Sequence, residues 1–212
     1  SRSLLKERPD KIWAIASGKG GVGKTLLAST FAILLSKLGK KTVVVDLDLG
    51  GSNLHTVLGL PQPDLTLDHF LTKKVRGIQD VCVPTPFENL SIISGLSGCL
   101  GYANPKYVQK IKLISKLREI DADYVILDIG AGNSYNELDF FLSADRHIVV
   151  TSPDPSSLQD AYHFIKTALY RKLGIFFRRH EKIVNFLSLC RERSYSTEMR
   201  HLLSEIFELG PE

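Results

Sequence analysis

Cysteine is scarce in this chain of 212 residues, which holds only Cys82, Cys99 and Cys190. The three are far apart and form no C-x-x-C pair. This spacing excludes the usual cysteine sites for zinc, for an iron–sulfur cluster and for thiol exchange. An odd number of separated cysteines also favours a reducing compartment, so we expect a cytoplasmic protein.

Long apolar runs are missing as well. No run approaches the ~18 residues that a membrane span needs. The N-terminal stretch SRSLLKERPDK is charged where a signal peptide has its apolar core. We therefore expect a soluble protein. Its length suits one domain that buries a core without disulfide or metal staples.

The net charge of +4 is small but unevenly spread. Between Lys166 and Arg193, eight lysines and arginines are opposed by two glutamates. Such a basic segment can face nucleic acid or anionic lipid. A solvated helix face is the commoner explanation, so nucleic acid is not the favoured partner.

Short runs rich in β-branched residues alternate with longer segments of helical period, which is typical of a parallel sheet joined by crossover helices. The runs are nearly continuous in apolar residues, as expected of strands covered on both faces. We therefore predict an α/β fold with a mostly parallel, doubly wound sheet and flanking helices. The predicted strands are 12–17, 41–48, 89–95, 123–130 and 146–152.

Apolar residues at a period near 3.6 predict helices over 24–38 and 105–120, the second with Asn104 as its N-cap. A third helix is predicted from Ser156 to Leu169, with Asp154 and Pro155 at its start. Past Leu173 the pattern is ambiguous. The run KIVNFLSLC fits a sixth strand or a buried helix equally well, and a further helix is predicted from Ser196 onward.

The stretch SGKGGVGKT, from Ser17 to Thr25, carries the chemistry. Gly18, Gly23, Lys24 and Thr25 match the phosphate-binding pattern G-x-x-x-x-G-K-[ST]. In that pattern the lysine reaches the terminal phosphates and the threonine hydroxyl binds Mg²⁺. The motif follows a predicted strand and opens a predicted helix, so backbone N–H groups converge on a phosphate. A nucleoside triphosphate is the predicted ligand.

Three aspartates are expected at the same edge of the sheet. Asp46 and Asp48 end the second predicted strand and Asp128 ends the fourth, and ligands of open α/β sheets lie beyond these strand ends. One such aspartate alone is as often a cap or a turn former. Three together favour phosphoryl transfer, which needs carboxylates to hold Mg²⁺ and to orient the attacking water.

Lys19 is a second lysine in the loop, and the phosphate-binding pattern does not use it. It lies early in the loop, where its side chain is expected to project away from the nucleotide pocket. Two cations so close to each other repel unless an anion stands between them or a second subunit brings one.

The segments KGGVGKT, VVVDLDLGGSNLH and YVILDIGAG resemble the deviant Walker A ATPases of the MinD/ParA family. In detail the chain is more similar to the flagellar-number regulators of the FlhG (FleN) type, because DIGAG and VVTSPDPSSLQDAYHFIK match their form. MinD proper has proline where Gly130 stands. The resemblance covers roughly Lys11 to Leu173. It divides the chain into a P-loop ATPase core, 1–173, and a partly helical segment, 174–212, that belongs to the same domain and is truncated.

The resemblance also implies roles for individual residues. Asp48 would position the attacking water, Asp46 and Asp128 would support Mg²⁺ bound by Thr25, and Lys19 would act with Lys24 in catalysis by reaching the phosphates of a facing subunit. Asn185 would read adenine, but only if KIVNFLSLC is a strand. The residues implied to bind ATP or ADP are otherwise Gly18, Gly20, Gly21, Val22, Gly23, Lys24, Thr25 and Leu26.

The function implied is an ATP-hydrolysing homodimerisation switch that sets the placement or number of a cellular structure, here flagella. A regulatory protein would read the pairing state. The resemblance also implies peripheral contact with the anionic inner face of the cell membrane, through a C-terminal helix that lies beyond this chain. Three alternatives stay open: a ParA-like DNA partitioner, an ATP-dependent metabolic enzyme or iron–sulfur carrier on the same loop, and a nucleotide-binding scaffold. Missing paired cysteines argue against the carrier, and Asp48 argues against the scaffold.

Overall fold

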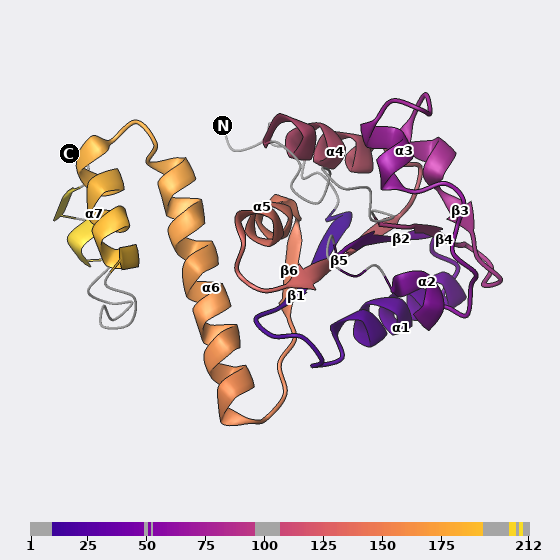
Figure 1. Ribbon diagram of the computed structural model, residues 1–212, viewed down its shortest axis with the longest axis horizontal. Coiled ribbons are helices and arrows are strands. Elements are labelled where there is room, and N and C mark those ends of the chain that lie inside the picture. The colour runs from indigo at the N-terminus through magenta and orange to yellow at the C-terminus, as the bar shows by residue number, and fades with distance from the viewer. Residues whose placement is uncertain are drawn as a thin grey trace, which may run out of the picture.

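A computed structural model of the chain describes residues 10–48, 51, 53–95, 107–192, 204–206 and 208–209. Their strands form one six-stranded sheet in the order β3-β4-β2-β5-β1-β6, with helices on both faces (Figure 1). The pairing is parallel throughout, except between β3 and β4. The mostly parallel sheet predicted from the sequence is thus confirmed. The strands are β1 (Ile12–Ser17), β2 (Thr42–Leu47), β3 (Val83–Pro84), β4 (Leu90–Ile93), β5 (Tyr124–Ala131) and β6 (Arg146–Val149).

The helices include the three that helical periodicity predicted. Their bounds are α1 (Lys24–Lys37), α2 (Leu54–Val57), α3 (Leu67–Leu71), the 3₁₀ helix η1 (Ile78–Val81), α4 (Tyr107–Glu119), α5 (Tyr135–Ser143), α6 (Pro155–Phe176) and α7 (Glu181–Glu192). The sequence analysis missed α2, α3, η1, α5 and β3. These elements have two to nine residues, so most of them are too short to show a period.

Two helical layers enclose the sheet. Alternate residues of β2 show the division, because Val43 and Val45 pack with α3, α4, α5 and α6, whereas Val44 packs with α1 and α2. In Figure 1 the short helix α2 lies beside α1 on one side of the sheet, and α3 and α4 lie on the other. Burial on both faces is the reason why the strands are apolar along almost their whole length.

The helix α1 is present as predicted, but only some of its large apolar residues, among them Phe31 and Leu35, pack against the sheet core, and most of its leucines are exposed. Its buried face consists of small residues, which let the helix lie close to the strands. Leu38, at its C-terminal end, is 75% exposed. The buried residues are Lys24, Ala28, Ser29, Ala32 and Ser36, and the exposed leucines are Leu26, Leu27, Leu34 and Leu38.

The start of α6 agrees with its prediction. Asp154 is the N-cap and accepts a hydrogen bond from the backbone N–H of Ser157 at 2.9 Å, and Pro155 occupies the first turn. The helix runs on to Phe176, through the predicted boundary at residue 173. The division into 1–173 and 174–212 therefore stays a prediction.

The run KIVNFLSLC is helical, because it lies inside α7. Ile183 and Leu187 of α7 pack against Tyr170 of α6 in a small apolar cluster that Ile206 joins. The strand alternative for this segment is wrong. The predicted cap at Asn104 and residues 196–203 of the predicted last helix lie outside the described residues.

The first residue of the glycine loop is held against α6. A Cβ atom at Gly18 would lie 2.2 Å from the carbonyl oxygen of Asp160 and 2.8 Å from the backbone nitrogen of Ala161. No side chain fits in this space, so a glycine here allows the loop and α6 to touch.

Gly18→Ala is therefore expected to lower the free energy of unfolding by about 1–3 kcal/mol, because the methyl group must push two backbone segments apart. Urea denaturation without nucleotide measures this change. Gly20→Ala is the matched control, since a Cβ atom at Gly20 meets nothing within 4 Å. Equal unfolding midpoints for the two variants would contradict the packing argument.

Candidate functional site

The glycine loop joins the end of β1 to the start of α1, as the phosphate-binding pattern requires. Gly21 and Gly23 have φ angles of +81° and +87°, in the left-handed region that suits glycine. A Cβ atom at either position would meet no atom within 4 Å, so the loop has open space beside it. A loop of this form at a helix N-terminus can wrap phosphate with its backbone N–H groups.

Lys24, the first residue of α1, forms a buried ion pair with Asp128 of β5. Its Nζ lies 2.6 Å from Oδ1 of Asp128, and the two side chains are 7% and 1% exposed. Burial raises the pKa of the Asp128 carboxyl group and the charge of Asp48 adds to the increase, whereas Lys24 and Thr25 lower it. The pair thus links the loop to the strand end where the predicted carboxylates gather.

Asp46 organises the segment that follows β2. Its Oδ1 accepts a hydrogen bond from the backbone N–H of Asp48 at 3.0 Å, and its Oδ2 accepts one from the N–H of Leu54 at 3.1 Å. Asp46 is buried and stands in register with Asp128 on the neighbouring strand. With both oxygens held by backbone groups, Asp46 suits a supporting role behind a metal ion rather than direct coordination.

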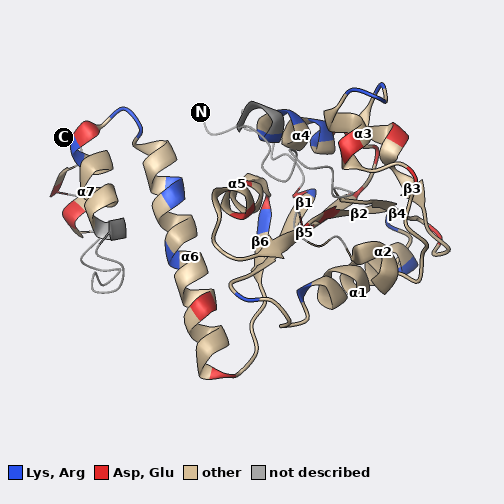
Figure 2. Cartoon of the chain, in the orientation of Figure 1, with Lys and Arg blue, Asp and Glu red and all other residues tan. Residues whose placement is uncertain are grey.

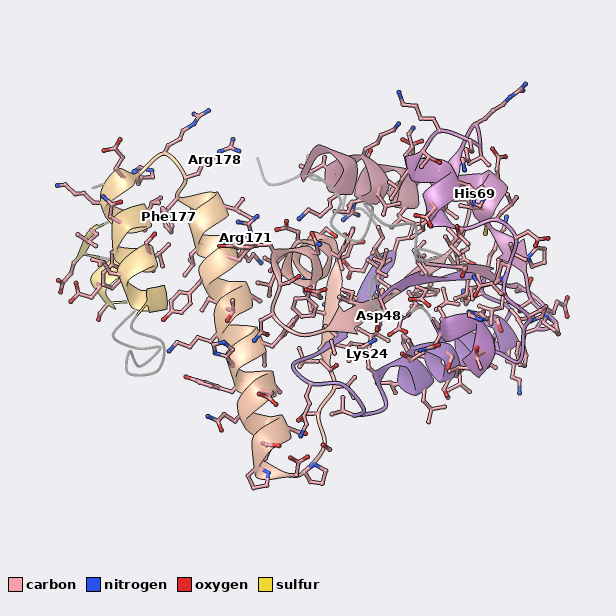
Figure 3. All side chains as sticks on the ribbon, viewed as in Figure 1. Lys24, Asp48, His69, Arg171, Phe177 and Arg178 are labelled. Carbon is pink, nitrogen blue, oxygen red and sulfur yellow. The ribbon has the colours of Figure 1, made fainter. Side chains whose placement is uncertain are left out.

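Asp48 lies against the end of β5. A Cβ atom at Gly130 would lie 3.4 Å from Oδ1 of Asp48 and 3.5 Å from Oε1 of Glu137, the first acidic residue of α5. Asp48 is therefore close to the backbone two residues after Asp128, and Figure 3 labels it beside Lys24. The structure brings Lys24, Asp46, Asp48 and Asp128 to one edge of the sheet, as predicted.

The oxygen atoms at this edge suit Mg²⁺ that arrives with a nucleotide. Among the described residues no three histidine, cysteine or carboxylate side chains gather into a metal site of their own. Magnesium bound with a nucleotide usually takes one or two protein oxygens and completes its shell with phosphate and water. The Thr25 hydroxyl and the nearby carboxylates are hard oxygen donors of that kind.

Lys19 points away from its own loop. Its Nζ donates a hydrogen bond to Oγ of Ser156 at 2.8 Å and lies 4.0 Å from Oδ1 of Asp154, at the start of α6. The side chain is 46% exposed. Hydrogen bonds from Ser152, and then from Ser157 and Ser156, hold the pKa of Asp154 far below its usual range. Lys19 therefore donates to a serine hydroxyl, with a carboxylate that stays anionic 4.0 Å away.

Three residues at the site were not singled out from the sequence. Asp154 and Ser156 hold Lys19, which only the packing of α6 beside the loop reveals. Asn133 follows Gly132 at the end of β5, and its Oδ1 is buried with no hydrogen-bond partner among the described residues. A buried amide oxygen in this position is open to a ligand or a water molecule. The position of Asn133 directly after the DIGAG motif was the sequence feature that could have drawn attention to it.

Asn185 does not belong to this site. It was assigned to adenine only if its segment formed a strand, and the segment is the helix α7, on which Asn185 is exposed. In Figure 1, α7 lies on the far side of α6 from the sheet. The assignment to adenine is withdrawn for this physical reason.

Within the described side chains, which reach Lys182 in this segment, the basic residues from Lys166 onward do not form one continuous charged face. Lys166 is buried and lies over the ring of Tyr170, and Arg171 pairs with Asp139 at 2.9 Å. Figure 2 shows that the basic positions along α6 are separated by uncharged turns, and that charge gathers at the connection to α7. The prediction that this segment is only a solvent-exposed helix face is therefore incomplete, because Lys166 is buried and Arg171 is paired with Asp139.

Comparison with known proteins also indicates a P-loop NTPase, as the glycine loop does. The family profile described as ParA, NUBPL iron-transfer P-loop NTPase, matches residues 8–176. The flagellum site-determining protein YlxH of Helicobacter pylori is 36% identical over 173 residues, covering 78% of this chain and 56% of YlxH. The antiactivator FleN of Pseudomonas aeruginosa is 31% identical over 160 residues, covering 74% and 56%. The chain thus spans little more than half the length of these curated relatives.

The fold is also similar to a solved structure. The septum site-determining protein MinD of Pyrococcus horikoshii, in complex with Mg-ADP, superposes with a TM-score of 0.64 at 28% identity. The match covers 76% of this chain and 65% of that one. The bound Mg-ADP is a property of that protein, and it shows that a closely similar fold accommodates this nucleotide.

The buried pair yields a prediction about stability and pH. Lys24→Ala leaves Asp128 buried without its cation, which is expected to cost about 3–5 kcal/mol of unfolding free energy at pH 8. Without Lys24 the pKa of folded Asp128 rises further above its unfolded value. As the pH falls, Asp128 of this variant takes up a proton in the folded chain before it does so in the unfolded chain. The loss of unfolding free energy in Lys24→Ala therefore shrinks as the pH falls toward 5.5.

Urea unfolding at both pH values, without nucleotide and with EDTA, measures the deficit. The double variant Lys24→Ala/Asp128→Asn is the control, because it has no carboxyl group to titrate at this position. A deficit of Lys24→Ala that is the same at pH 8 and pH 5.5 would argue against the raised pKa of Asp128.

Proposed function

Because the chain belongs to the ParA family of P-loop NTPases, as its motifs predicted, we propose that it is an ATP-driven dimerisation switch. In this proposal two chains pair when each holds ATP, and hydrolysis releases them. The glycine loop, Lys24 and Thr25 bind the phosphates, and Asp48 orients the attacking water. Mg²⁺ bound with ATP neutralises phosphate charge during transfer.

The observation that carries the proposal is the direction of Lys19. Its ammonium group leaves its own loop, is half-exposed, and rests on Ser156 at the start of α6. To reach a facing chain, Lys19 has to give up only an exposed hydrogen bond to Ser156 and a weak ion pair with Asp154. There it would offset negative charge on the other nucleotide in the transition state, as an arginine finger does.

The biological role that we propose follows the roles of the relatives. YlxH is a flagellum site-determining protein, FleN is an antiactivator, and MinD is a septum site-determining protein. We infer that the pairing state of this chain sets the placement or number of a cellular structure, flagella in the first instance. A regulatory protein would read that state in the cytoplasm or at the inner face of the membrane. None of the described helices combines the length and apolar character that crossing a bilayer needs.

Two other functions are less well supported. The family profile names iron transfer, but the three cysteines of the sequence are far apart and offer no paired thiolates for a cluster. DNA partitioning rests on the basic segment, of which Lys166 and Arg171 are engaged inside the protein. DNA binding that weakens steeply with salt would revive that alternative.

Light scattering after size exclusion, with and without ATP and Mg²⁺, tests the proposal directly. A shift from monomer to dimer with ATP, reversed by hydrolysis, is the expected result. A mass that does not change with nucleotide would overturn the switch.

Asp48→Ala is expected to bind ATP nearly as the unmutated chain does but to hydrolyse it about 10²-fold or more slowly, because positioning of the water dominates this chemistry. The ATP-bound dimer should then accumulate. Single-turnover hydrolysis and light scattering measure both effects. Hydrolysis at the unmutated rate would remove Asp48 from the mechanism.

Lys19→Ala is expected to keep ATP binding to the monomer and to lose both ATP-dependent pairing and hydrolysis. Lys24→Ala, by contrast, should weaken ATP binding itself. Mixing Lys19→Ala with Asp48→Ala tests action in trans, because both chains bind ATP and the intact pocket of the Lys19→Ala chain then meets the Lys19 of its partner. Partial recovery of hydrolysis in the mixture supports the role. If Lys19→Ala alone pairs and hydrolyses normally, the cross-subunit role is wrong.

A further inference from the structure

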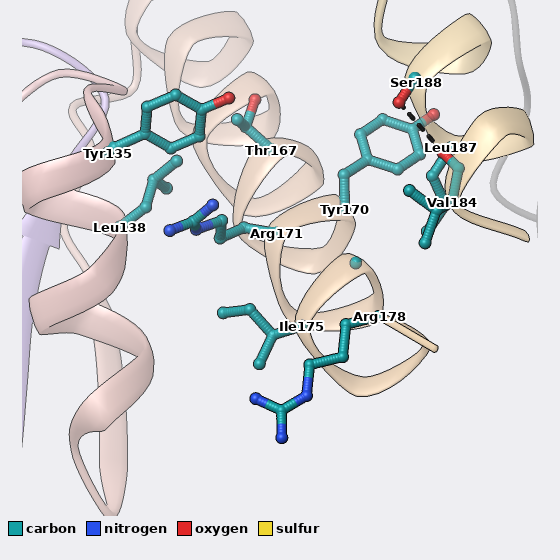
Figure 4. Close-up of a pocket in the computed structure, with 11 residues that line it drawn as sticks. Tyr135, Leu138, Thr167, Tyr170, Arg171, Ile175, Arg178, Val184, Leu187 and Ser188 are labelled. Carbon is teal, nitrogen blue, oxygen red and sulfur yellow. Dashed lines mark hydrogen bonds between the residues drawn. The ribbon is translucent and has the colours of Figure 1, made fainter. Parts of the chain in front are cut away.

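A second cavity lies away from the phosphate loop, between α5, α6 and α7 (Figure 4). It has a volume of about 480 Å³, within the range of small-molecule sites. Its walls belong to these three helices and to the turn between α6 and α7, and it shares no residue with the glycine loop or the aspartate edge. Its lining includes Leu138, Ile175, Val184 and Leu187 as apolar groups, and Tyr135, Thr167, Arg171 and Arg178 as polar ones.

Gly174 contributes to the hollow. It occupies the middle of the wall formed by α6, and a Cβ atom there would meet no atom within 4 Å. Glycine in a helix interior is unfavourable because it has no side chain to restrict the unfolded chain. Here its small size leaves space beside Arg171 of α6, and Arg178 lines the same cavity from the turn that follows the helix.

The wall of the cavity carries an excess of positive charge. Asp139 of α5 accepts from Lys110 Nζ at 2.5 Å with Oδ2 and from Arg171 Nε at 2.9 Å with Oδ1. Lys110 and Asp139 are buried. One carboxylate thus balances two cations. Of the three residues only Arg171 lines the cavity, and its side chain is 29% exposed. The cavity therefore presents a guanidinium group that an anion would complement.

The two arginines are placed to receive that anion. The guanidinium group of Arg171 lies over the ring of Tyr135, 4.6 Å from its centre, and extends toward Leu138 in Figure 4. Its hydrogen bond to Asp139 uses Nε, and the residue is part of the cavity lining. Arg178 is exposed at the rim, and its guanidinium group points to the same side as Ile175.

We propose that this cavity binds an amphipathic anion: an apolar body carrying one phosphate or carboxylate group. The apolar body would pack against Leu138, Ile175 and Leu187, and the head group would meet Arg171 and Arg178. Guanidinium groups bind these planar or tetrahedral anions through charge-assisted hydrogen bonds. Free amphiphiles and anionic lipids share this chemistry.

Calorimetric titration of the nucleotide-free protein with octyl phosphate, below its micellar concentration, tests the site. Octanol and inorganic phosphate are the matched probes, each with one half of the chemistry. Octyl phosphate should bind at least about tenfold more tightly than either, because charged hydrogen bonds and apolar burial act together. Equal binding of octanol and octyl phosphate would overturn the proposal.

Two pairs of variants locate the site. Gly174→Leu fills the cavity and should weaken octyl phosphate about tenfold or more, whereas Gly174→Ala leaves most of the space and should not. Arg178→Gln should weaken it by up to about tenfold, whereas Arg179→Gln changes a neighbouring exposed arginine outside the lining. Unchanged affinity in Gly174→Leu would place any binding elsewhere and sink the assignment.

Co-sedimentation with phosphatidylcholine vesicles, with and without phosphatidate, separates the two sources of the ligand. Binding to phosphatidate vesicles that Gly174→Leu abolishes indicates a membrane lipid. Binding of octyl phosphate without vesicle binding indicates a free amphiphile. Failure of both probes would refute the pocket and leave the proposed ATP switch untouched, since no nucleotide is present in these measurements.

Discussion

The buried ion pair between Lys24 and Asp128 joins the two parts of the candidate nucleotide site. Lys24 belongs to the first turn of α1, and Asp128 to the strand β5 in the middle of the sheet. Their 2.6 Å contact holds the loop over the strand end in a region that water does not reach. An ion pair so deeply buried is costly to break from one side, so both partners constrain where the loop can lie.

Close packing around the Lys24–Asp128 ion pair helps to hold its two partners in place. The small residues on the buried face of α1 let the helix approach the sheet, and Gly18 lets α6 approach the loop. Asp46 holds the backbone of Asp48 in register beside β5. Neighbouring segments are thus held close at three places, by small side chains on α1, by the absent side chain of Gly18 and by the buried carboxylate of Asp46.

The long helix α6 connects the two regions that have been assigned functions. Its first turn holds Lys19, and its last turns form the wall of the cavity with α5 and α7. Arg171 and Lys166, which look like part of a basic surface in the sequence, are drawn into the protein by Asp139 and by the ring of Tyr135 or Tyr170. Lys166 is buried, whereas Arg171 remains partly exposed at the cavity.

The sequence by itself determined the parallel sheet and the phosphate loop. Apolar strand runs and the spacing of Gly18, Gly23, Lys24 and Thr25 are local patterns, and their structural meaning needs no distant contact. Asp46, Asp48 and Asp128 were predictable for a related reason, because the ends of parallel strands meet at one edge.

Only the tertiary structure decided which face of α1 is buried, whether KIVNFLSLC is a helix, and where Lys19 and Arg171 point. A short apolar run fits a strand or a helix equally well until a partner such as Tyr170 covers it. A long cationic side chain likewise reaches several positions, and its partner lies more than thirty residues away in Arg171 and more than a hundred in Lys19. Such contacts depend on how distant segments pack, which no local pattern specifies.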